Sequence, residues 1–158
     1  MTPYRADIEA AAKRHLLDPD LVEALVVVES SGQADAFRFE PAFYERYLEG
    51  KPEYRGAIPR RISSSYGLCQ VMYPVARELG FKGQPEELFV PATSLEYGCR
   101  KLRALIDWSL GNVDAALAAY NGGKVGNRRA PYRNQRYVTK VIAARERVRA
   151  ARREGVSG

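Results

Sequence analysis

The sequence predicts a protein built mainly from α-helices, and three observations support that class. Apolar residues recur at intervals of three and four in several stretches, as they do on the buried face of a helix. Asp, Asn and Pro stand where these stretches begin, and Gly stands where most of them end. No run of alternating strands or internal repeat is visible. The fold is therefore all-α, or mainly α with one small hairpin.

The composition fits one domain of ordinary globular character. The chain has 158 residues, of which 46% are hydrophobic and 28% are charged, and we expect residues 1–158 to form a single domain. No apolar run approaches the roughly 20 residues that span a bilayer, and the N-terminus lacks the apolar core of a signal peptide. The net charge of +6 permits an anionic partner, whether nucleic acid, anionic lipid or an acidic cell-wall polymer.

Few residues are suited to metal or triad chemistry. The two cysteines, Cys69 and Cys99, make neither a disulfide framework nor a metal site. The sequence leaves open whether they pair with each other. His15 is the one histidine, and we interpret it as structural because it stands just before a turn. We therefore expect no metal and no cofactor.

The first half of the chain begins with two helices. Residues 4–16 show helical spacing, and a mostly apolar helix follows, with Asp18 as its N-cap, Pro19 at its first position and Gly32 as its stop. A short helix runs from Pro41 to residue 48. Residues 50–65 form a loop or a small hairpin, and residues 65–72 form a compact turn that leads into an apolar segment.

Glu29 lies in the last turn of the second helix. It falls beside the apolar face made by Leu21, Leu25 and Val28, whereas Glu23 is expected to point away from that face. A carboxylate in this position loses solvation, so its pKa should rise, as a general acid near neutral pH requires. The structural alternative is a glutamate at a helix end that reaches water or caps a loop.

The second half of the chain predicts four further helices. One runs from Pro74 to about residue 80. A longer one follows Pro91 and carries an apolar stripe that includes Cys99, and Asn112 caps the next. The last helix starts near Asn134. Its outer side carries Lys140, Arg145, Arg147, Arg149, Arg152 and Arg153.

Four short elements occur in a specific order. They are Glu29-Ser30, Gly67-Leu68-Cys69-Gln70-Val71-Met72, Ala119-Tyr120-Asn121-Gly122-Gly123 and Tyr137-Val138. With these elements, residues 6–145 resemble the soluble lytic transglycosylase (SLT) family, the goose-lysozyme-like branch of the lysozyme superfamily. That family has Glu-Ser at a helix end, a Gly-Leu-Met-Gln turn, an Ala-Tyr-Asn element and a later Tyr. The resemblance implies a lysozyme-like fold with helices around a substrate cleft, and leaves a basic C-terminal helix and tail to residue 158.

The resemblance implies cleavage of the β-1,4 bond between N-acetylmuramic acid and N-acetylglucosamine in peptidoglycan. Glu29 would protonate the leaving oxygen and then, as a carboxylate, take the proton from the C6 hydroxyl of the muramic acid. That hydroxyl attacks C1, so the product is a 1,6-anhydro sugar. This scheme needs one titrating carboxylate, whereas ordinary glycosidases use a pair.

The resemblance also implies a set of substrate contacts. Gly67 would let the backbone approach a sugar, the Leu68 and Cys69 amides would meet its polar groups, and Gln70 offers a donor and an acceptor. The expected substrate-binding residues are Ser30, Ser65, Gly67, Leu68, Gln70, Met72, Tyr120, Asn121 and Tyr137.

Each of these roles has a structural alternative. The Gln70 amide can satisfy buried backbone groups, Met72 can belong to the core, and Tyr120 can be a packed helix aromatic. The hydroxyls of Tyr120 and Tyr137 would otherwise orient Glu29 or the reacting sugar, while Asn121 would fix its loop or contact substrate.

The chain departs from the family pattern in three places. Cys69 replaces the usual Met, the segment between Glu29 and Gly67 is longer than in compact members, and no acidic residue stands shortly before Tyr137. The long segment brings Glu40, the candidate second carboxylate. It could assist Glu29 or position a water, which would move the outcome toward hydrolysis, or it could pair with a neighbouring arginine.

Other functions stay open from the sequence. A goose-type muramidase would hydrolyse the same bond, and a non-catalytic module would bind cell wall or nucleic acid, although no nucleic-acid-binding signature accompanies the basic helix. We expect a bacteriolytic monomer that acts on peptidoglycan, with no nucleic-acid partner and no membrane span. The site of action would be the periplasm or the cell exterior. A larger parent protein, a cleaved leader or a phage would supply the route.

Overall fold

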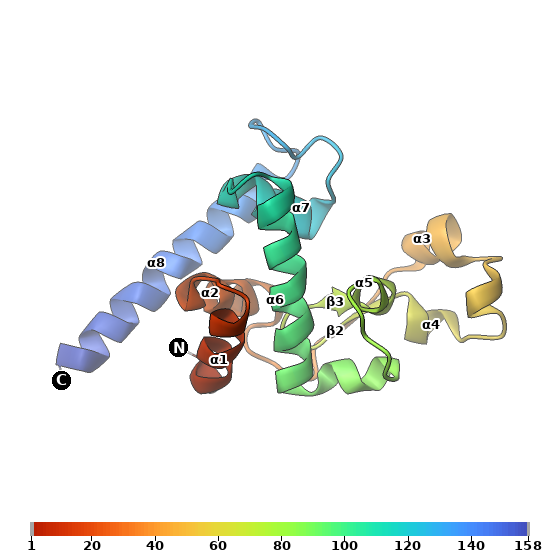
Figure 1. Cartoon of the computed structure of the whole chain (residues 1–158), viewed down its shortest axis with the longest axis horizontal. Coiled ribbons are helices and arrows are strands. Elements are labelled where there is room, and N and C mark those ends of the chain that lie inside the picture. The colour runs from red at the N-terminus through yellow and green to blue at the C-terminus, as the bar shows by residue number, and fades with distance from the viewer. Residues whose placement is uncertain (1, 158) are drawn as a thin grey trace. The chain divides into compact units, whose positions relative to one another are not determined.

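The computed structural model describes residues 2–157, and these residues are mostly helical (Figure 1). The α-helices are α1 (Arg5–Arg14), α2 (Pro19–Ser30), α3 (Pro41–Phe43), α4 (Pro59–Ile62), α5 (Tyr73–Glu78), α6 (Pro91–Trp108), α7 (Val113–Gly122) and α8 (Gln135–Ser157). A π-helical turn is η1 (Tyr44–Leu48), and two 3-10 turns are η2 (Pro52–Tyr54) and η3 (Pro85–Phe89). The strands are β1 (Phe37–Phe39), β2 (Ser64–Tyr66) and β3 (Val71–Met72). The prediction of a mainly α fold is confirmed, and a three-stranded antiparallel sheet stands where one small hairpin was expected.

The chain divides into two compact units. Unit 1 comprises Met1–Val28 and Cys99–Gly158, and unit 2 comprises Glu29–Gly98. The divisions fall inside α2 and α6, so each unit contains part of both helices. The expectation of one domain over residues 1–158 stays a prediction.

The predicted helix caps in unit 1 are confirmed. An Asp18 carboxylate oxygen accepts a hydrogen bond from the Asp20 amide at 2.9 Å, and the Asn112 side chain accepts one from the Ala115 amide at 3.2 Å. Both bonds satisfy amides that the first helical turn leaves without an intrahelical partner. The α7 helix that Asn112 caps is buried from Ala115 to Tyr120 and packs on α8.

The expectation that Glu23 points away from the apolar face of α2 is wrong. Residues 21–26 are all buried, and the Glu23 side chain is 0% exposed. Its Oε1 accepts a hydrogen bond from the Thr2 hydroxyl at 3.2 Å, and its Oε2 lies 3.7 Å from Nη1 of Arg5. The segment that precedes α1, together with α1 itself, covers the face that helical periodicity assigns to solvent.

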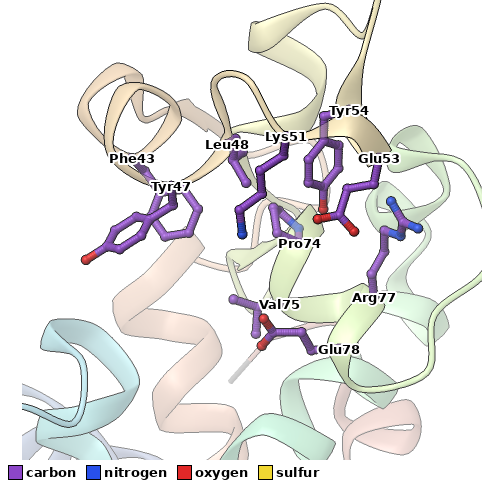
Figure 2. Close-up of a pocket in the computed structure, with 10 residues that line it drawn as sticks. All are labelled: Phe43, Tyr47, Leu48, Lys51, Glu53, Tyr54, Pro74, Val75, Arg77 and Glu78. Atoms are coloured by element: carbon purple, nitrogen blue, oxygen red, sulfur yellow. The ribbon is translucent and has the colours of Figure 1, made fainter.

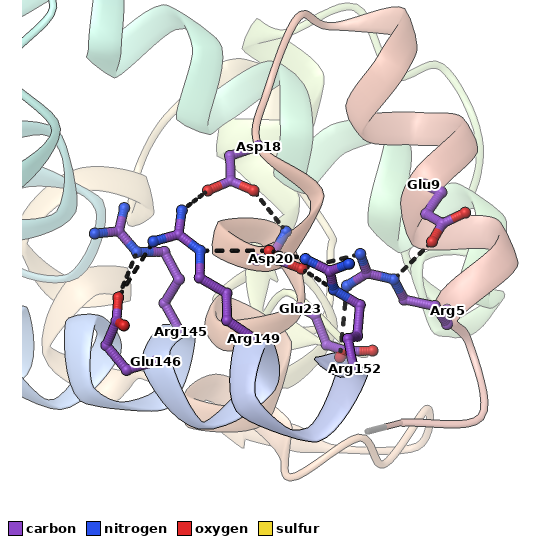
Figure 3. A network of polar contacts seen from close by, with 9 residues as sticks. All are labelled: Arg5, Glu9, Asp18, Asp20, Glu23, Arg145, Glu146, Arg149 and Arg152. Atoms are coloured by element: carbon purple, nitrogen blue, oxygen red, sulfur yellow. Dashed lines mark hydrogen bonds and ion pairs between the residues drawn. The ribbon is translucent and has the colours of Figure 1, made fainter. Parts of the chain in front are cut away.

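Asp20, in the first turn of α2, is the centre of an ion-pair network in unit 1 (Figure 3). Nη2 of Arg5 lies 2.9 Å from its Oδ1, and Nε of Arg152 donates to the same oxygen at 2.7 Å. Arg149 donates to Asp18 at 2.7 Å. Burial by itself would raise the pKa of Asp20, but the hydrogen bonds and charges of Arg152 and Arg5 lower it.

The network corrects the expectation that Arg149 and Arg152 lie on the outer side of α8. Arg149 and Arg152 are half-buried and paired with carboxylates at the start of α2. Arg147, two residues from Arg149, is exposed. One face of α8 is therefore fixed by ion pairs, while the adjoining face meets water.

Unit 2 is built on an antiparallel sheet in the order β1-β2-β3. Phe37 pairs with Tyr66 in the first ladder, and Ser65 pairs with Met72 in the second. Residues 50–65 are neither an open loop nor a hairpin of their own, because η2, α4 and the start of β2 lie within them and β2 pairs with the earlier strand β1. Strands of two or three residues are too short to produce a periodic signal, so β1 was not predicted.

A clasp closes the chain between β1 and β2. The Glu40 amide donates to the Ser63 carbonyl at 2.8 Å, and the Ser63 hydroxyl donates to the Glu40 carbonyl at 2.7 Å. Residues 41–62, which form α3, η1, η2 and α4, leave and return at this point. We call these residues the excursion.

The remaining sequence predictions concern burial. The apolar stripe of α6 is buried as expected, and both Cys69 and Cys99 are buried thiols. Among residues 2–157, no helix has the length and apolar character that crossing a membrane requires.

Replacing Asp20 with Asn should lower the free energy of unfolding by about 2 kcal/mol at neutral pH, because partly buried guanidiniums lose their carboxylate. The folded-state pKa of Asp20 is lowered, so its stabilising contribution is complete above the unfolded pKa of about 4 and is lost as the pH falls through the folded value. Urea denaturation of wild type and Asp20→Asn should therefore converge as the pH drops below about 4.

The control is Asp35→Asn, which removes an exposed carboxylate from unit 2 and should change stability by less than about 0.5 kcal/mol. Equal stability of Asp20→Asn and wild type at neutral pH would contradict the role given to the network.

Candidate functional site

Glu29 is half-buried in the last turn of α2, and the next residue, Ser30, is buried. The helix ends because the chain enters the left-handed region at Ser31 (φ 54°) and Gly32 (φ 75°). The Gln33 amide then donates to the Ser30 carbonyl at 3.0 Å. Glu29 therefore stands at the carboxyl end of a helix.

The predicted site residues are divided between the two units. Unit 2 contains Glu29, Ser30, Glu40, Ser65, Gly67, Leu68, Gln70 and Met72, whereas unit 1 contains Tyr120, Asn121 and Tyr137. In unit 2 the sheet positions five of them. Ser65 is on β2, Met72 is on β3, and the turn between these strands contains Gly67, Leu68 and Gln70. Ser65 is buried and Met72 is half-buried.

Gly67 begins the turn with a φ of 73°, which favours glycine. Its amide donates to the Ala36 carbonyl at 2.8 Å. A Cβ at this position would lie 2.5 Å from the Leu88 carbonyl oxygen and 3.0 Å from the hydroxyl of Ser94. The protein's own backbone thus approaches this glycine closely, and the approach to a sugar that the resemblance implies stays a prediction.

The turn also uses polar groups that were expected to meet substrate. The Cys69 amide donates to the Ser94 hydroxyl at 3.1 Å, so this amide is engaged inside the protein. The Leu68 side chain is fully buried. Ser94, at the start of α6, supports the turn, and no sequence pattern distinguishes it from the other polar residues there.

The Gln70 side chain stabilises this turn through hydrogen bonds. Its φ is 50°, and its Nε2 donates to the carbonyls of Ala36 at 3.1 Å and Gly67 at 3.0 Å. These two bonds account for both amide hydrogens and match the structural alternative given for this residue. The Oε1 atom is left as the acceptor of a half-buried side chain.

An aromatic cluster supports the same sheet, and no sequence motif predicts it. The ring centroids of Phe37 and Phe89 lie 5.3 Å and 5.0 Å from that of Tyr66. The Tyr66 hydroxyl donates to the Arg61 carbonyl at 2.5 Å. Burial is the main cause that raises the pKa of Tyr66 to about 12. The ring therefore stays neutral through the physiological range.

Glu40 makes the ion pair that the sequence offered as its structural role. Its Oε1 lies 3.1 Å from Nε of Arg38, and its side chain is 34% exposed. Because the pair is largely solvated, it contributes little to stability. It nevertheless gives Glu40 a cationic neighbour on the same segment, as a structural carboxylate would have.

The site residues of unit 1 are arranged around Asn134. Its Nδ2 donates to Oδ1 of Asn121 at 2.9 Å and to the Ala118 carbonyl at 2.9 Å, and its carbonyl accepts from the Tyr137 amide at 2.9 Å. A Cβ at Gly122 would lie 2.8 Å from Nδ2 of Asn134. Asn134 thus joins the Asn121-Gly122 pair to the start of α8.

Tyr120 is buried beside a lysine that sequence reasoning missed. Nζ of Lys101, on α6, lies 3.9 Å from the Tyr120 ring centroid and donates to the Tyr120 carbonyl at 2.9 Å. The contact joins residues far apart in the sequence, so no local pattern predicts it. The positive charge over the ring adds a cation–π interaction to the packing that holds this side chain.

Unit 2 contains a pocket of about 510 Å³, and no predicted site residue lines it (Figure 2). Its lining residues are Phe43, Tyr47, Leu48, Lys51, Glu53, Tyr54, Pro74, Val75, Arg77 and Glu78. Figure 2 shows the Lys51 and Glu53 side chains extending from the excursion toward α5. The Arg77 guanidinium lies over the Tyr54 ring, 5.5 Å from its centroid, and burial raises the pKa of Tyr54. Rings and charges of both signs suit a ligand with a flat face and polar groups.

Comparisons with known proteins point to one family. The transglycosylase SLT domain matches residues 7–142. A similar solved structure is that of an inactive mutant of the lytic transglycosylase Slt from Pseudomonas aeruginosa, with a TM-score of 0.71 and 20% sequence identity over 92% of this chain and 24% of that one. The chain therefore spans about a quarter of that protein's length, and the likeness is one of fold. No curated protein matches the sequence.

Gly67→Ala should lower the free energy of unfolding by about 3 kcal/mol, because a left-handed alanine is strained and its Cβ meets the Leu88 carbonyl. The matched control is Gly111→Ala. Gly111 has a similar φ of 87°, but open space surrounds its Cβ position. Its substitution should cost about 1 kcal/mol. Urea denaturation of both variants separates the steric cost of the Cβ from the cost of the left-handed backbone. Equal losses of unfolding free energy would show that the Leu88 carbonyl moves to accommodate the Cβ.

Proposed function

The chain belongs to the transglycosylase SLT domain family, the family that its four sequence elements predicted, and from that premise we propose that it is a lytic transglycosylase that cleaves peptidoglycan. The observation that carries the proposal is the span of the family match, residues 7–142, which includes Glu29 and every expected substrate-binding residue through Tyr137. The lysozyme-like fold supports it.

Glu29 is the carboxylate best suited to act as general acid. Within residues 29–98, all of which the structure describes, the half-buried carboxylates are Glu29, Glu40 and Glu96. Glu40 is paired with an arginine, and Glu96 lies outside the four sequence elements. Glu29 is half-buried at the end of α2 and belongs to the Glu-Ser element of the family pattern, so we propose it as the group that begins protonated and acts as the general acid.

In the proposed reaction Glu29 gives one proton to the substrate and takes one proton back from it. Glu29 donates its proton to the bridging oxygen as the C1–O bond of N-acetylmuramic acid breaks. The resulting carboxylate takes the proton of the C6 hydroxyl, whose oxygen bonds to C1. The products are a 1,6-anhydromuramic acid end and a free hydroxyl on N-acetylglucosamine, and no water is consumed. Glu29 finishes protonated, ready for the next turnover.

Other residues are proposed in supporting roles. We propose that Oε1 of Gln70 accepts a hydrogen bond from the substrate, since its amide nitrogen is already used within the turn. Tyr120, Asn121 and Tyr137 are proposed as sugar contacts in unit 1. We propose a monomer that acts at the cell wall.

Glu29→Gln should lower the rate of peptidoglycan cleavage by at least about 100-fold, because glutamine cannot donate the proton. The control is Glu49→Gln, an exposed residue of the same unit, which should retain wild-type activity. Turbidity of purified peptidoglycan gives the rate, and mass spectrometry of the released muropeptides identifies the product. Equal clearing by Glu29→Gln and wild type would reject Glu29 as the acid. Inactivity of all three folded proteins would favour a binding module.

Glu40→Gln should keep the rate within about fivefold of wild type, because a largely solvated ion pair is worth at most about 1 kcal/mol. The product should remain the anhydro form, which is lighter by one water than the product of hydrolysis. A reducing muramic acid end from wild type that disappears in Glu40→Gln would instead assign Glu40 a water-positioning role and identify the enzyme as a muramidase.

A further inference from the structure

The positive charge of the chain is concentrated in one segment. Between Asp114 and Glu146 there is no acidic residue, although the segment contains seven basic ones: Lys124, Arg128, Arg129, Arg133, Arg136, Lys140 and Arg145. Its charge of +7 exceeds the +6 of the whole chain. Like charges this close repel one another, so they lower stability unless an anion neutralises them.

Five of these cations lie on the connection from α7 to α8 and its first helical residues, 124–136, which we call the basic loop. Lys124, Arg128, Arg129, Arg133 and Arg136 are all exposed. Within residues 2–157, none of these five forms an ion pair, in contrast to Arg5, Arg149 and Arg152 in the network of Figure 3. The first turn of α8 contains no acidic residue either. The fold therefore neutralises the arginines of α8 near α2 and leaves those of the basic loop without carboxylates.

The basic loop is held in a defined shape. Asn127 is fully buried at its base, where its Nδ2 donates to the Gly123 carbonyl at 2.9 Å and its Oδ1 accepts from the Arg133 amide at 2.9 Å. The Arg133 side chain packs against Gly126. A Cβ built on Gly126 would lie 2.5 Å from the Cδ atom of Arg133. A cation array held by such contacts loses less conformational entropy when it binds an anion.

Trp108 supports one side of the array. The Arg128 guanidinium lies 5.1 Å from the centroid of a Trp108 ring and donates to the Trp108 carbonyl at 3.0 Å. Nζ of Lys124 lies 5.7 Å from the same ring. By contrast, Arg129 and Arg136 have no side-chain hydrogen bond or ion pair among the described residues, so their guanidinium groups are available to a ligand.

The basic loop is joined directly to a proposed sugar contact. It lies between Asn121 and Tyr137 in the sequence, and Nδ2 of Asn134 donates to Oδ1 of Asn121 at 2.9 Å. An anion bound by the basic loop would therefore lie beside the sugar-contacting end of α7. The muramic acid of peptidoglycan carries peptide stems that bear carboxylates, and guanidinium groups bind carboxylates through paired hydrogen bonds.

We propose that the basic loop recognises the carboxylates of the peptide stems, with Arg129 and Arg136 as principal contacts, so that the enzyme selects glycan that still bears peptides. The inference rests on the proposed function, because it takes peptidoglycan as the substrate. It assigns a specificity-determining role to residues that take no part in the proton transfers of Glu29.

The test compares peptidoglycan with the same glycan strands after an amidase has removed the peptides. Wild type should show a higher kcat/KM on the peptide-bearing strands, and the double variant Arg129→Ala/Arg136→Ala should reduce this preference about tenfold, as loss of charge-assisted hydrogen bonds predicts. Arg147→Ala, which removes one exposed arginine of α8 outside the basic loop, should keep the wild-type preference. An unchanged preference in the double variant, or an equal decrease on both substrates, would overturn the proposal.

A binding measurement separates this inference from the proposed function. Calorimetry with free stem peptide and folded wild-type protein needs no turnover, so it reports peptide recognition even if no cleavage is observed. Binding should weaken in the double variant and as salt concentration rises. Binding of a polyol-phosphate wall polymer at the basic loop, without binding of the peptide, would overturn the assignment to carboxylates.

Discussion

The buried charge at the start of α2 is the constraint on which unit 1 depends. Asp20 draws Arg5 from α1 and Arg152 from α8 to one carboxylate, so the first and last helices are both fixed to α2. A carboxylate with this little solvent contact is tolerated only when cations surround it. The network thereby fixes the starting point of the helix that carries Glu29 in its last turn. Electrostatics at one end of α2 supports chemistry proposed for the other.

The residues of the family motif serve the fold before they serve chemistry. Gly67 is required by the Leu88 carbonyl, Gln70 fastens the turn to Ala36, and Gly122 makes room for Asn134. Each of these contacts is internal to the protein. In the turn of unit 2, the groups that these contacts leave free include one amide oxygen of Gln70 and the half-buried Met72, and in unit 1 Asn121 is exposed. A motif residue can therefore be essential without touching a sugar.

Sequence reasoning succeeded where the signal is local. Helical spacing located the helices, and capping preferences identified Asp18 and Asn112, because each of these depends on residues within one or two turns. It failed for Glu23, whose partners come from the segment before α1, and for β1, whose ladder joins it to a strand more than twenty residues later. The Lys101 contact with Tyr120 was missed for the same reason. The catalytic assignment of Glu29 came from the order of four motifs, since one half-buried carboxylate does not distinguish itself by composition.

The clasp between Glu40 and Ser63 has a consequence for how this protein can vary. Because Glu40 and Ser63 are hydrogen-bonded to each other, the pairing of β1 with β2 does not depend on the length of the chain between these two residues. Doubling such a loop costs only about 0.6 kcal/mol in closure entropy. The excursion can therefore change in length and sequence without altering the sheet, and it supplies most of the side chains that line the 510 Å³ pocket. Insertions and deletions here can remodel that pocket while the turn at Gly67 and the helix end at Glu29 stay as they are.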